Sequence, residues 1–262
     1  MTAFTVLGAY GYIGRNLVAY IRSQGHTVWA PKRGDEQIFG QPLGHVIYCV
    51  GLTADFRNRP FDTVDGHVTL LSELLRRAQF DSLLYLSSTR VYIGAASTEE
   101  DAALTVLPGD PSYLYNLTKL TGESLCHASG RAGVRVARLS NVVGPGMVDN
   151  SGNLVADLLQ QSRQGHVVLR SHPSSVKDYI HIDDVVKWLL LIALNGKFAT
   201  YNVASGVQTM HGQWLEWLQT RTSCTVEVTG SPPLQHFPPI DVLRLKRECG
   251  VLPRNVLTDD LL

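Results

Sequence analysis

The sequence predicts an α/β protein with a doubly wound parallel sheet and a small C-terminal lobe. Short apolar runs alternate with segments of helical periodicity over the first 200 residues, a pattern typical of a parallel sheet that is covered by helices on both faces. The first apolar run leads directly into the glycine-rich stretch GAYGYIG at residues 8–14, and RNLVAYIRSQG follows it with helical spacing. Strand, glycine turn and helix are therefore expected at the start of the chain.

The remaining elements follow in the same alternating order. Strands are expected at 4–7, 26–30, 45–51, 82–88, 133–140 and 200–204. Helices are expected within 63–79 and at 112–129, 183–194 and 211–222. Only about fifteen residues separate the second strand from the third, too few for a further strand with its crossover helix. One strand-helix unit found in larger proteins of this type is therefore expected to be missing.

The length of 262 residues favours one main core with an appended lobe. We expect residues 1–140 plus 178–200 to form a Rossmann-like domain. Residues 141–177 are rich in Gly, Ser, Asn and His, and the prolines of SPPLQHFPP interrupt regular secondary structure in the C-terminal segment. We therefore expect 141–177 plus 201–262 to form the substrate-binding lobe. Such a lobe would cover the carboxyl ends of the strands, where ligands bind in open α/β sheets.

Composition excludes several classes of function. Lys and Arg total 23, as do Asp and Glu, so no bulk charge favours nucleic acid or an anionic membrane. The four cysteines form no C-x-x-C pair and no metal-ligand spacing, and we interpret them as reduced thiols in a cytoplasmic protein without a metal. No apolar stretch approaches the length of about 20 residues that spans a membrane, and the N-terminus has no signal-peptide pattern.

The glycine turn predicts a dinucleotide site. Glycines between a first strand and a first helix let the backbone approach a pyrophosphate, whose charge is favoured at the helix N-terminus. A tight turn without a ligand is the alternative. The expected cofactor contacts are Gly8, Tyr10, Gly11, Tyr12, Ile13 and Gly14 in the turn, and Val50 and Gly51 at the end of the third strand.

Seven motifs in order along the chain resemble those of the extended short-chain dehydrogenase/reductases, the NAD-dependent epimerase/dehydratase family. They are GAYGYIG, LSSTRVY (86–92), YNLTK (115–119), RLSNVVGPG (138–146), DYIHIDDVV (178–186), YNVASG (201–206) and DVLRLKRECGVLPR (241–254). The resemblance implies an NAD(P)-dependent enzyme that acts on a nucleotide-linked sugar. It also implies a homodimer formed through the helix that carries YNLTK and the helix before it.

Tyr115, Lys119 and Ser88 are the expected catalytic residues. Positions four apart share a helix face, so Tyr115 and Lys119 can meet, although an exposed surface pair has the same spacing. The resemblance makes Tyr115 the proton carrier, Ser88 the group that holds the substrate oxygen, and Lys119 a contact of the nicotinamide ribose. We expect the Lys119 ammonium and an oxidised nicotinamide to lower the phenol pKa from its ordinary value of about 10. If the strand ends one residue earlier or later, Ser87 or Thr89 would make this contact in place of Ser88.

The resemblance also suggests substrate contacts at Ser88, Thr89, Asn141 and Lys177. Related dehydratases carry an Asp-Glu pair where this chain has Thr89 and Arg90, so dehydration is disfavoured. Asn141 matches a contact of the sugar diphosphate, or it bonds the backbone of its own loop. Lys177 stands where related enzymes have Arg and can meet a phosphate as a point charge. His181 and Asp183 are expected to cap the following helix.

The cofactor preference depends on PKRGDE after the second strand. Lys32 and Arg33 suit the 2′-phosphate of NADP, whereas NAD-binding proteins commonly place an acidic residue there; Asp35 could still loop back to the ribose. A reductase that uses NADPH on a keto group of a nucleotide sugar is therefore favoured. An epimerase that uses tightly held NAD is the alternative, and a non-catalytic dinucleotide-binding protein is a third, less favoured one.

Overall fold

The central element is a six-stranded parallel sheet with the order β2-β1-β3-β4-β5-β9. The computed structural model describes residues 1–53, 55–147, 152–232, 234–250 and 253–261. The sheet strands are β1 (Ala3–Leu7), β2 (Thr27–Trp29), β3 (His45–Tyr48), β4 (Ser82–Ser88), β5 (Val134–Leu139) and β9 (Thr200–Val203). All five strand pairs are parallel. The predicted fold class is confirmed.

The predicted absence of one strand-helix unit is also confirmed. β2 and β3 are joined by a loop that contains only the 3₁₀ turn η1 (Glu36–Phe39), and both strands pair with β1, on opposite sides of it. The strand order reverses at this point of the sheet. Open α/β sheets bind their ligands at such a switch point, beyond the carboxyl ends of the two strands.

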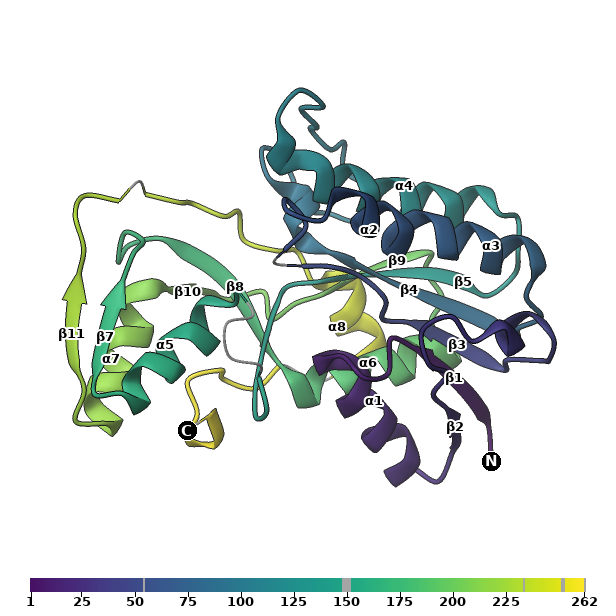
Figure 1. Cartoon of the computed structure of the whole chain (residues 1–262), viewed down its shortest axis with the longest axis horizontal. Helices are drawn as coiled ribbons and strands as arrows, with labels where there is room; N and C mark the ends of the chain where they lie inside the picture. Colours follow the sequence, from purple (N-terminus) through teal and green to yellow (C-terminus); the bar gives the residue numbers. More distant parts are fainter. Residues whose placement is uncertain (54, 148–151, 233, 251–252, 262) are drawn as a thin grey trace.

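Helices cover both faces of the sheet (Figure 1). One face carries α1 (Tyr12–Ser23) and α6 (Ile182–Asn195), which bury Leu17, Ile21 and Trp188 against the strands. The other face carries α2 (Pro60–Val64), the π-turn η2 (Asp65–Thr69), α3 (Leu70–Arg77) and α4 (Leu114–Ala128). Its core includes Leu71 and Leu74. Because both faces are buried, the strands are apolar on both sides, as the near-continuous hydrophobic runs predicted.

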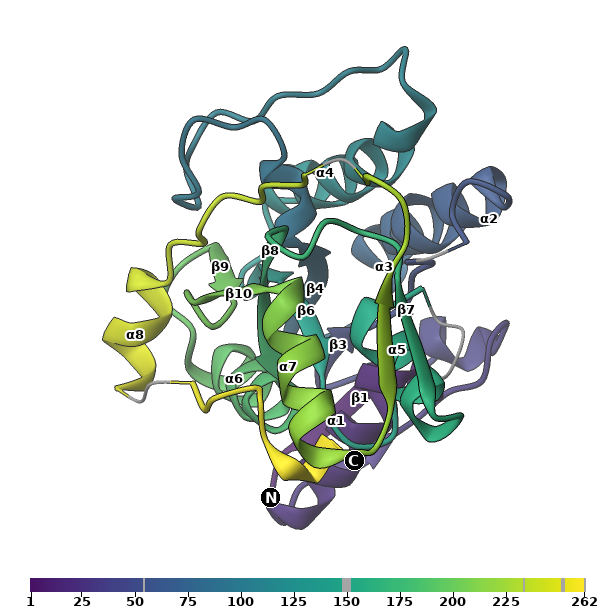
Figure 2. The ribbon, with the colours of Figure 1, turned by 90° about the vertical axis from the view of Figure 1, so that its left-hand side faces the viewer.

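The second part of the molecule is the lobe, which lies beside the carboxyl-end side of the sheet (Figures 1 and 2). Its strands form the sheets β10-β8-β6 and β11-β7. Its elements are β6 (Asn141–Val143), α5 (Leu154–Arg163), β7 (His166–Leu169), β8 (Val176–His181), β10 (Gln208–Met210), α7 (His211–Arg221) and β11 (Thr225–Val228). Trp214, Trp217 and Tyr179 give the lobe a core of its own.

The boundary between the two parts differs from the expected one in three places. β9 pairs with β5 in the main sheet, so residues 201–203 do not belong to the lobe. α8 (Leu243–Cys249) packs Leu245 into the core that α1 and α6 share. Residues 178–181 end β8, which pairs within the lobe. Pairing between strands far apart in sequence decides these assignments, and the local pattern does not reveal it. Residues 148–151 of the expected lobe and residues 251–252 of the last motif lie outside the described residues.

In the part of the chain that the structure describes, no helix combines the length and the apolar character needed to cross a bilayer. The same residues contain no group of three His, Cys, Asp or Glu side chains arranged to hold a metal. The four cysteines are free thiols, and two of them, Cys126 and Cys224, are buried.

Candidate active site

The glycine turn is built for close backbone approach. Gly8 has a φ of +79°, and a Cβ there would lie 2.7 Å from the Cys49 carbonyl oxygen. A Cβ on Gly14 would clash with the Gly8 carbonyl oxygen. Gly11 is the N-cap of α1, and its N–H donates to the Gly8 oxygen at 3.1 Å. Because its N-cap is a glycine, α1 has no side-chain cap from that residue, and its N-terminal N–H groups can face an anion, as a dinucleotide pyrophosphate requires.

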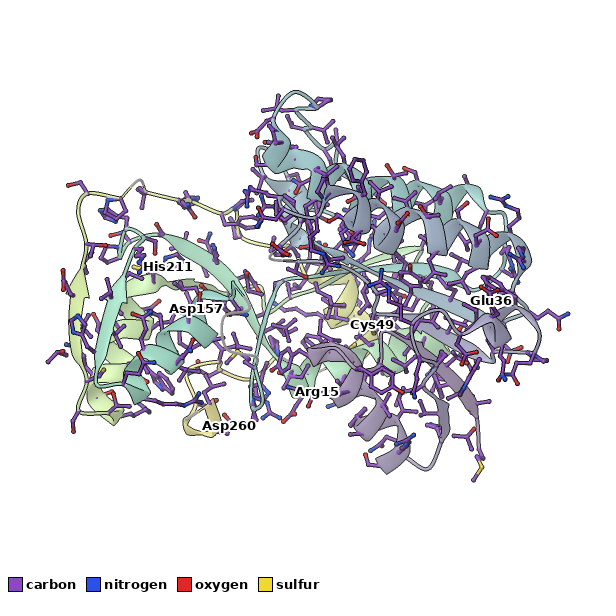
Figure 3. The ribbon with its side chains drawn as sticks, in the orientation of Figure 1. Arg15, Glu36, Cys49, Asp157, His211 and Asp260 are labelled. Atoms are coloured by element: carbon purple, nitrogen blue, oxygen red, sulfur yellow. The ribbon has the colours of Figure 1, made fainter. Side chains whose placement is uncertain are left out.

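The side chains of the turn lie around this helix end. Tyr10 is exposed and its hydroxyl donates to the Ala30 carbonyl at 3.2 Å. Tyr12 begins α1 with a buried hydroxyl that has no hydrogen-bond partner, and burial raises its pKa. Ile13 packs against the core. Arg15, labelled in Figure 3 on the side of α1 nearer the lobe, donates to the Gly146 carbonyl and so ties the turn to the loop after β6.

The end of β3 brings the expected cofactor site next to Lys119. Cys49 lies near the middle of the molecule (Figure 3). Val50, the next residue, packs against the core that contains Leu71 and Leu74. Gly51 is exposed. A Cβ on Gly51 would lie 3.3 Å from Lys119 Nζ and 2.8 Å from His67 Nε2. The absence of a side chain at Gly51 therefore keeps the approach to the lysine open.

Ser88, Tyr115 and Lys119 converge from two elements. Ser88 is the last residue of β4, and its oxygen accepts the Arg90 N–H at 3.2 Å, which ends the strand. Tyr115 and Lys119 lie one turn apart on α4, with Lys119 Nζ 5.9 Å from the Tyr115 ring centroid. Lys119 Nζ donates to the Leu86 carbonyl at 2.8 Å. The lysine and the tyrosine are both buried, so this is not an exposed surface pair.

The electrostatics differ from the expectation in one respect. Burial raises the pKa of Tyr115, while side-chain hydrogen bonds with Ser88 and Thr53 and the charge of Arg90 act in the opposite direction. Burial also lowers the pKa of Lys119 to about 7, against the charges of Glu123 and Cys49. In the protein alone, desolvation exceeds the effect of nearby charges, so Lys119 by itself does not lower the phenol pKa; the lowering expected with an oxidised nicotinamide stays a prediction. At neutral pH Tyr115 is a protonated phenol, which is the form that can donate a proton.

The expected substrate residues have different surroundings. Thr89 is buried at the start of the 3₁₀ turn η3 (Thr89–Tyr92). The Asn141 amide donates to the Asp178 carbonyl of the neighbouring strand β8 at 2.8 Å, and not to the backbone of its own loop. Lys177 on β8 is half-buried, makes no ion pair within the described residues, and has a pKa lowered by burial and by Arg90. The predicted cap is confirmed for His181, whose Nδ1 accepts the Asp183 N–H at 3.2 Å.

Comparison with known proteins identifies the family. The model of the NAD dependent epimerase/dehydratase family matches residues 4–204. The chain belongs to this family. Membership confirms the predicted class of enzyme, an NAD(P)-dependent reductase or epimerase of the short-chain dehydrogenase/reductase type, and with it the class of cofactor.

Individual relatives in the family are distant. The chain is 23% identical over 249 residues to dTDP-4-dehydro-6-deoxy-D-allose reductase from Streptomyces bikiniensis, covering 78% of this chain and 76% of that protein. The solved structure of MoeE5 in complex with UDP-glucuronic acid and NAD has a TM-score of 0.81 and 21% identity, covering 99% and 96% of the two chains. RMD from Pseudomonas aeruginosa, complexed with NADPH, has a TM-score of 0.77 and 22% identity, covering 100% and 96%. These likenesses to solved structures show the shared fold.

The two basic residues of this family member after β2 lie on the surface. Lys32 is exposed, and the Arg33 side chain is 86% exposed with a guanidinium nitrogen 3.7 Å from an Asp62 oxygen. Asp35 accepts the Gln37 N–H at 3.1 Å and so caps η1. Asp35, the carboxylate expected to reach the ribose if NAD binds, is therefore engaged in a local turn, whereas both basic side chains remain exposed.

Sequence reasoning missed the residues that surround Lys119. Glu123, one turn after Lys119, forms a buried ion pair with Arg138 of β5 at 2.6 Å and accepts from Ser87. Burial and the Lys119 charge lower the pKa of His67 to about 2, so its ring is neutral. His67 lies in the π-turn, edge-on to Tyr115 with ring centroids 5.3 Å apart. π-turns are frequent at functional sites but have no clear sequence pattern. The charged pair could have been suspected from Glu123 on the helix face that carries Lys119.

Proposed function

We propose that this protein reduces a keto group of a nucleotide-linked sugar with NADPH. The observation that carries the proposal is the convergence of a buried, protonated Tyr115 with Ser88 and with a lysine whose ammonium lies 5.9 Å from the phenol ring. The similarity to a reductase of a dTDP-linked keto sugar supports the substrate class. In the arrangement that we propose, residues 1–140 and the helix α6 bind the cofactor, and the lobe covers the sugar nucleotide.

Each catalytic residue has one task in this reaction. A bound nicotinamide cofactor supplies the hydride. Ser88 holds the substrate oxygen, since its hydroxyl can donate and accept at once. Tyr115 donates its proton to that oxygen as the alcohol forms. Lys119 then stabilises the resulting phenolate, which requires the ammonium form, and it also holds the cofactor ribose.

The remaining contacts belong to the cofactor and the substrate. The turn residues Gly8 to Gly14, with Val50 and Gly51, hold the dinucleotide. Lys32 and Arg33 bind the 2′-phosphate, which the local engagement of Asp35 supports. Thr89, Asn141 and Lys177 contact the sugar nucleotide, with the charge of Lys177 on the diphosphate. Two copies form a homodimer through α4 and α3.

Replacement of Tyr115 by Phe tests the catalytic assignment. The variant lacks only the proton donor, so we expect turnover to fall by at least about a hundredfold while NADPH binding, followed by tryptophan quenching, persists. Tyr113→Phe is the matched control, because Tyr113 lies in η4 (Pro111–Tyr113), before the first turn of α4. Turnover in Tyr115→Phe equal to that of the control would refute the assignment.

An NAD-dependent epimerase is the second candidate, because the ion pair of Arg33 with Asp62 draws that guanidinium away from a 2′-phosphate. The same three residues would then oxidise and re-reduce one carbon with no net use of cofactor. NAD(H) that co-purifies with the protein, together with sugar inversion without added cofactor, would favour this candidate. A need for stoichiometric NADPH would exclude it.

A further inference from the structure

Two arginines flank one buried aromatic ring beside Tyr115. The guanidinium carbons of Arg57 and Arg90 lie 4.5 Å and 5.4 Å from the ring centroid of Phe56. Phe56 is 2% exposed, and its ring centroid lies 5.5 Å from that of Tyr115. The Arg90 guanidinium carbon is itself 5.8 Å from the Tyr115 ring centroid. Two cations are therefore held next to the proposed proton donor.

Neither arginine has a carboxylate partner among the described residues. Arg90 Nε donates to Asn116 Oδ1 at 3.1 Å and Nη2 donates to the Ser112 carbonyl at 3.3 Å. Both acceptors are neutral, and Nη1 makes no hydrogen bond to a described residue. The nearby Arg59, in contrast, forms an ion pair with Asp62 at 2.8 Å.

The surroundings make this arrangement unfavourable without a further negative charge. Burial and then the charge of Arg57 lower the pKa of Arg90, and Arg90 in turn lowers the pKa of the half-buried Lys177. The charge of Asp110 acts on both arginines, but Asp110 is fully exposed, accepts the Ser112 N–H at 2.8 Å and makes no ion pair with either of them. A partly buried charge beside a like charge is destabilising when its counter-charge is exposed to solvent. An anionic ligand would supply the missing charge.

We propose that Arg90 and Arg57 bind a carboxylate carried by the sugar ring of the substrate, next to the carbonyl group that Tyr115 protonates. This inference rests on the proposed function and narrows its substrate class to acidic sugars. The planar guanidinium of Arg90 matches a carboxylate through its free Nη1 protons, and Arg57, 4.5 Å from the Phe56 ring centroid, adds a second cation. The position next to the Tyr115 ring assigns the anion to the reacting ring.

Calorimetric titration of the NADPH-saturated protein with UDP-glucuronic acid and UDP-glucose tests the inference, since these ligands differ only in carboxylate against hydroxymethyl. We expect the wild type to bind UDP-glucuronic acid more tightly by about tenfold or more. Arg90→Gln should remove most of this preference by weakening only the acidic ligand. Arg57→Gln should reduce it in part, and because Arg57 is exposed this variant keeps the test valid if Arg90→Gln fails to fold. Arg59→Gln should leave the preference unchanged.

Equal affinities in the wild type would overturn the inference. Equal weakening of both ligands by Arg90→Gln would also overturn it, because the guanidinium would then act on the diphosphate that the two ligands share. Failure of both ligands to bind while NADPH still quenches the tryptophans would refute the acidic-sugar inference for UDP-linked substrates, but not the proposed reductase. If the wild type does not bind NADPH, the proposed function itself is refuted.

Discussion

The buried ion pair between Glu123 and Arg138 provides the sharpest test of how the catalytic helix is held. Glu123 lies on α4, one turn after Lys119, and Arg138 lies on β5. Arg138 Nε contacts both carboxylate oxygens at 3.1 Å and Nη2 contacts one at 2.6 Å. The side chains are 6% and 4% exposed. We propose Arg138→Met, which leaves the Glu123 carboxylate buried without its partner.

The expected loss follows from the burial. Removal of one partner of a buried, hydrogen-bonded pair costs about 3–5 kcal/mol, because the other charge stays desolvated. For a chain of this size each kcal/mol corresponds to about 2–4 °C in Tm, so Arg138→Met should melt roughly 6–20 °C below the wild type. Replacement of both residues by Met removes both buried charges and should recover most of that loss.

Thermal and urea unfolding, followed by circular dichroism, measure these differences. Arg77→Met is the matched control, since Arg77 pairs with Glu73 at 3.0 Å with side chains 52% and 34% exposed. An exposed pair is worth less than about 1 kcal/mol, so this variant should melt close to the wild type. A loss below about 1 kcal/mol in Arg138→Met, or a double variant no more stable than the single one, would contradict our interpretation of this pair.

Three further predictions follow from the site. Gly14→Ala should weaken NADPH binding by about tenfold or more, because its Cβ meets the Gly8 carbonyl, whereas Gly109→Ala, outside the turn and with no neighbour within 4 Å of its Cβ, should bind normally; equal affinities would contradict the close-approach argument. Lys119→Met should raise the free energy of unfolding near pH 6 by roughly 3–5 kcal/mol. Because burial lowers the pKa of Lys119 from 10.5 to about 7, the unfolded chain binds more protons than the folded one between these pH values. The increase in the free energy of unfolding should therefore shrink as pH rises toward 10.5. An increase that does not depend on pH would refute the claim that Lys119 is buried as a charged group at low pH. Lys32→Glu should weaken NADPH binding by about tenfold and leave NADH binding unchanged, as fluorescence titration would show; equal weakening of both would remove Lys32 from the 2′-phosphate site.

The sequence predicted the parts of the fold that depend on local pattern. The main-sheet strands, the glycine turn and α4 were found because apolar runs, glycine spacing and helical periodicity determine them directly. The lobe strands β6, β7, β8, β10 and β11 are three to six residues long and pair across large sequence separations, so their pattern carries little signal. α5 was missed although Asn153 caps it by accepting the Val155 N–H at 2.9 Å.

The site was predictable where a motif fixes residue types at a spacing, and not where burial decides the chemistry. Ser88, Tyr115 and Lys119 were identified from their motifs. Burial raises the pKa of Tyr115 in the protein alone, and the motif did not indicate this effect, because desolvation depends on packing that no spacing reveals. Arg90 was noted only as the residue that replaces an acidic one in related dehydratases. Only the structure shows that Arg90 has no carboxylate partner among the described residues. His67 could not be anticipated, since the π-turn that directs it toward Tyr115 has no recognisable period.

The most direct test of the proposed reductase is to mix the NADPH-loaded protein with neutral and carboxylated keto nucleotide sugars and follow nicotinamide absorbance. We predict that NADPH is consumed in proportion to the alcohol formed, and that Tyr115→Phe abolishes the change. Inversion of a sugar without net loss of NADPH, or no NADPH consumption with any keto sugar, would contradict the reductase assignment.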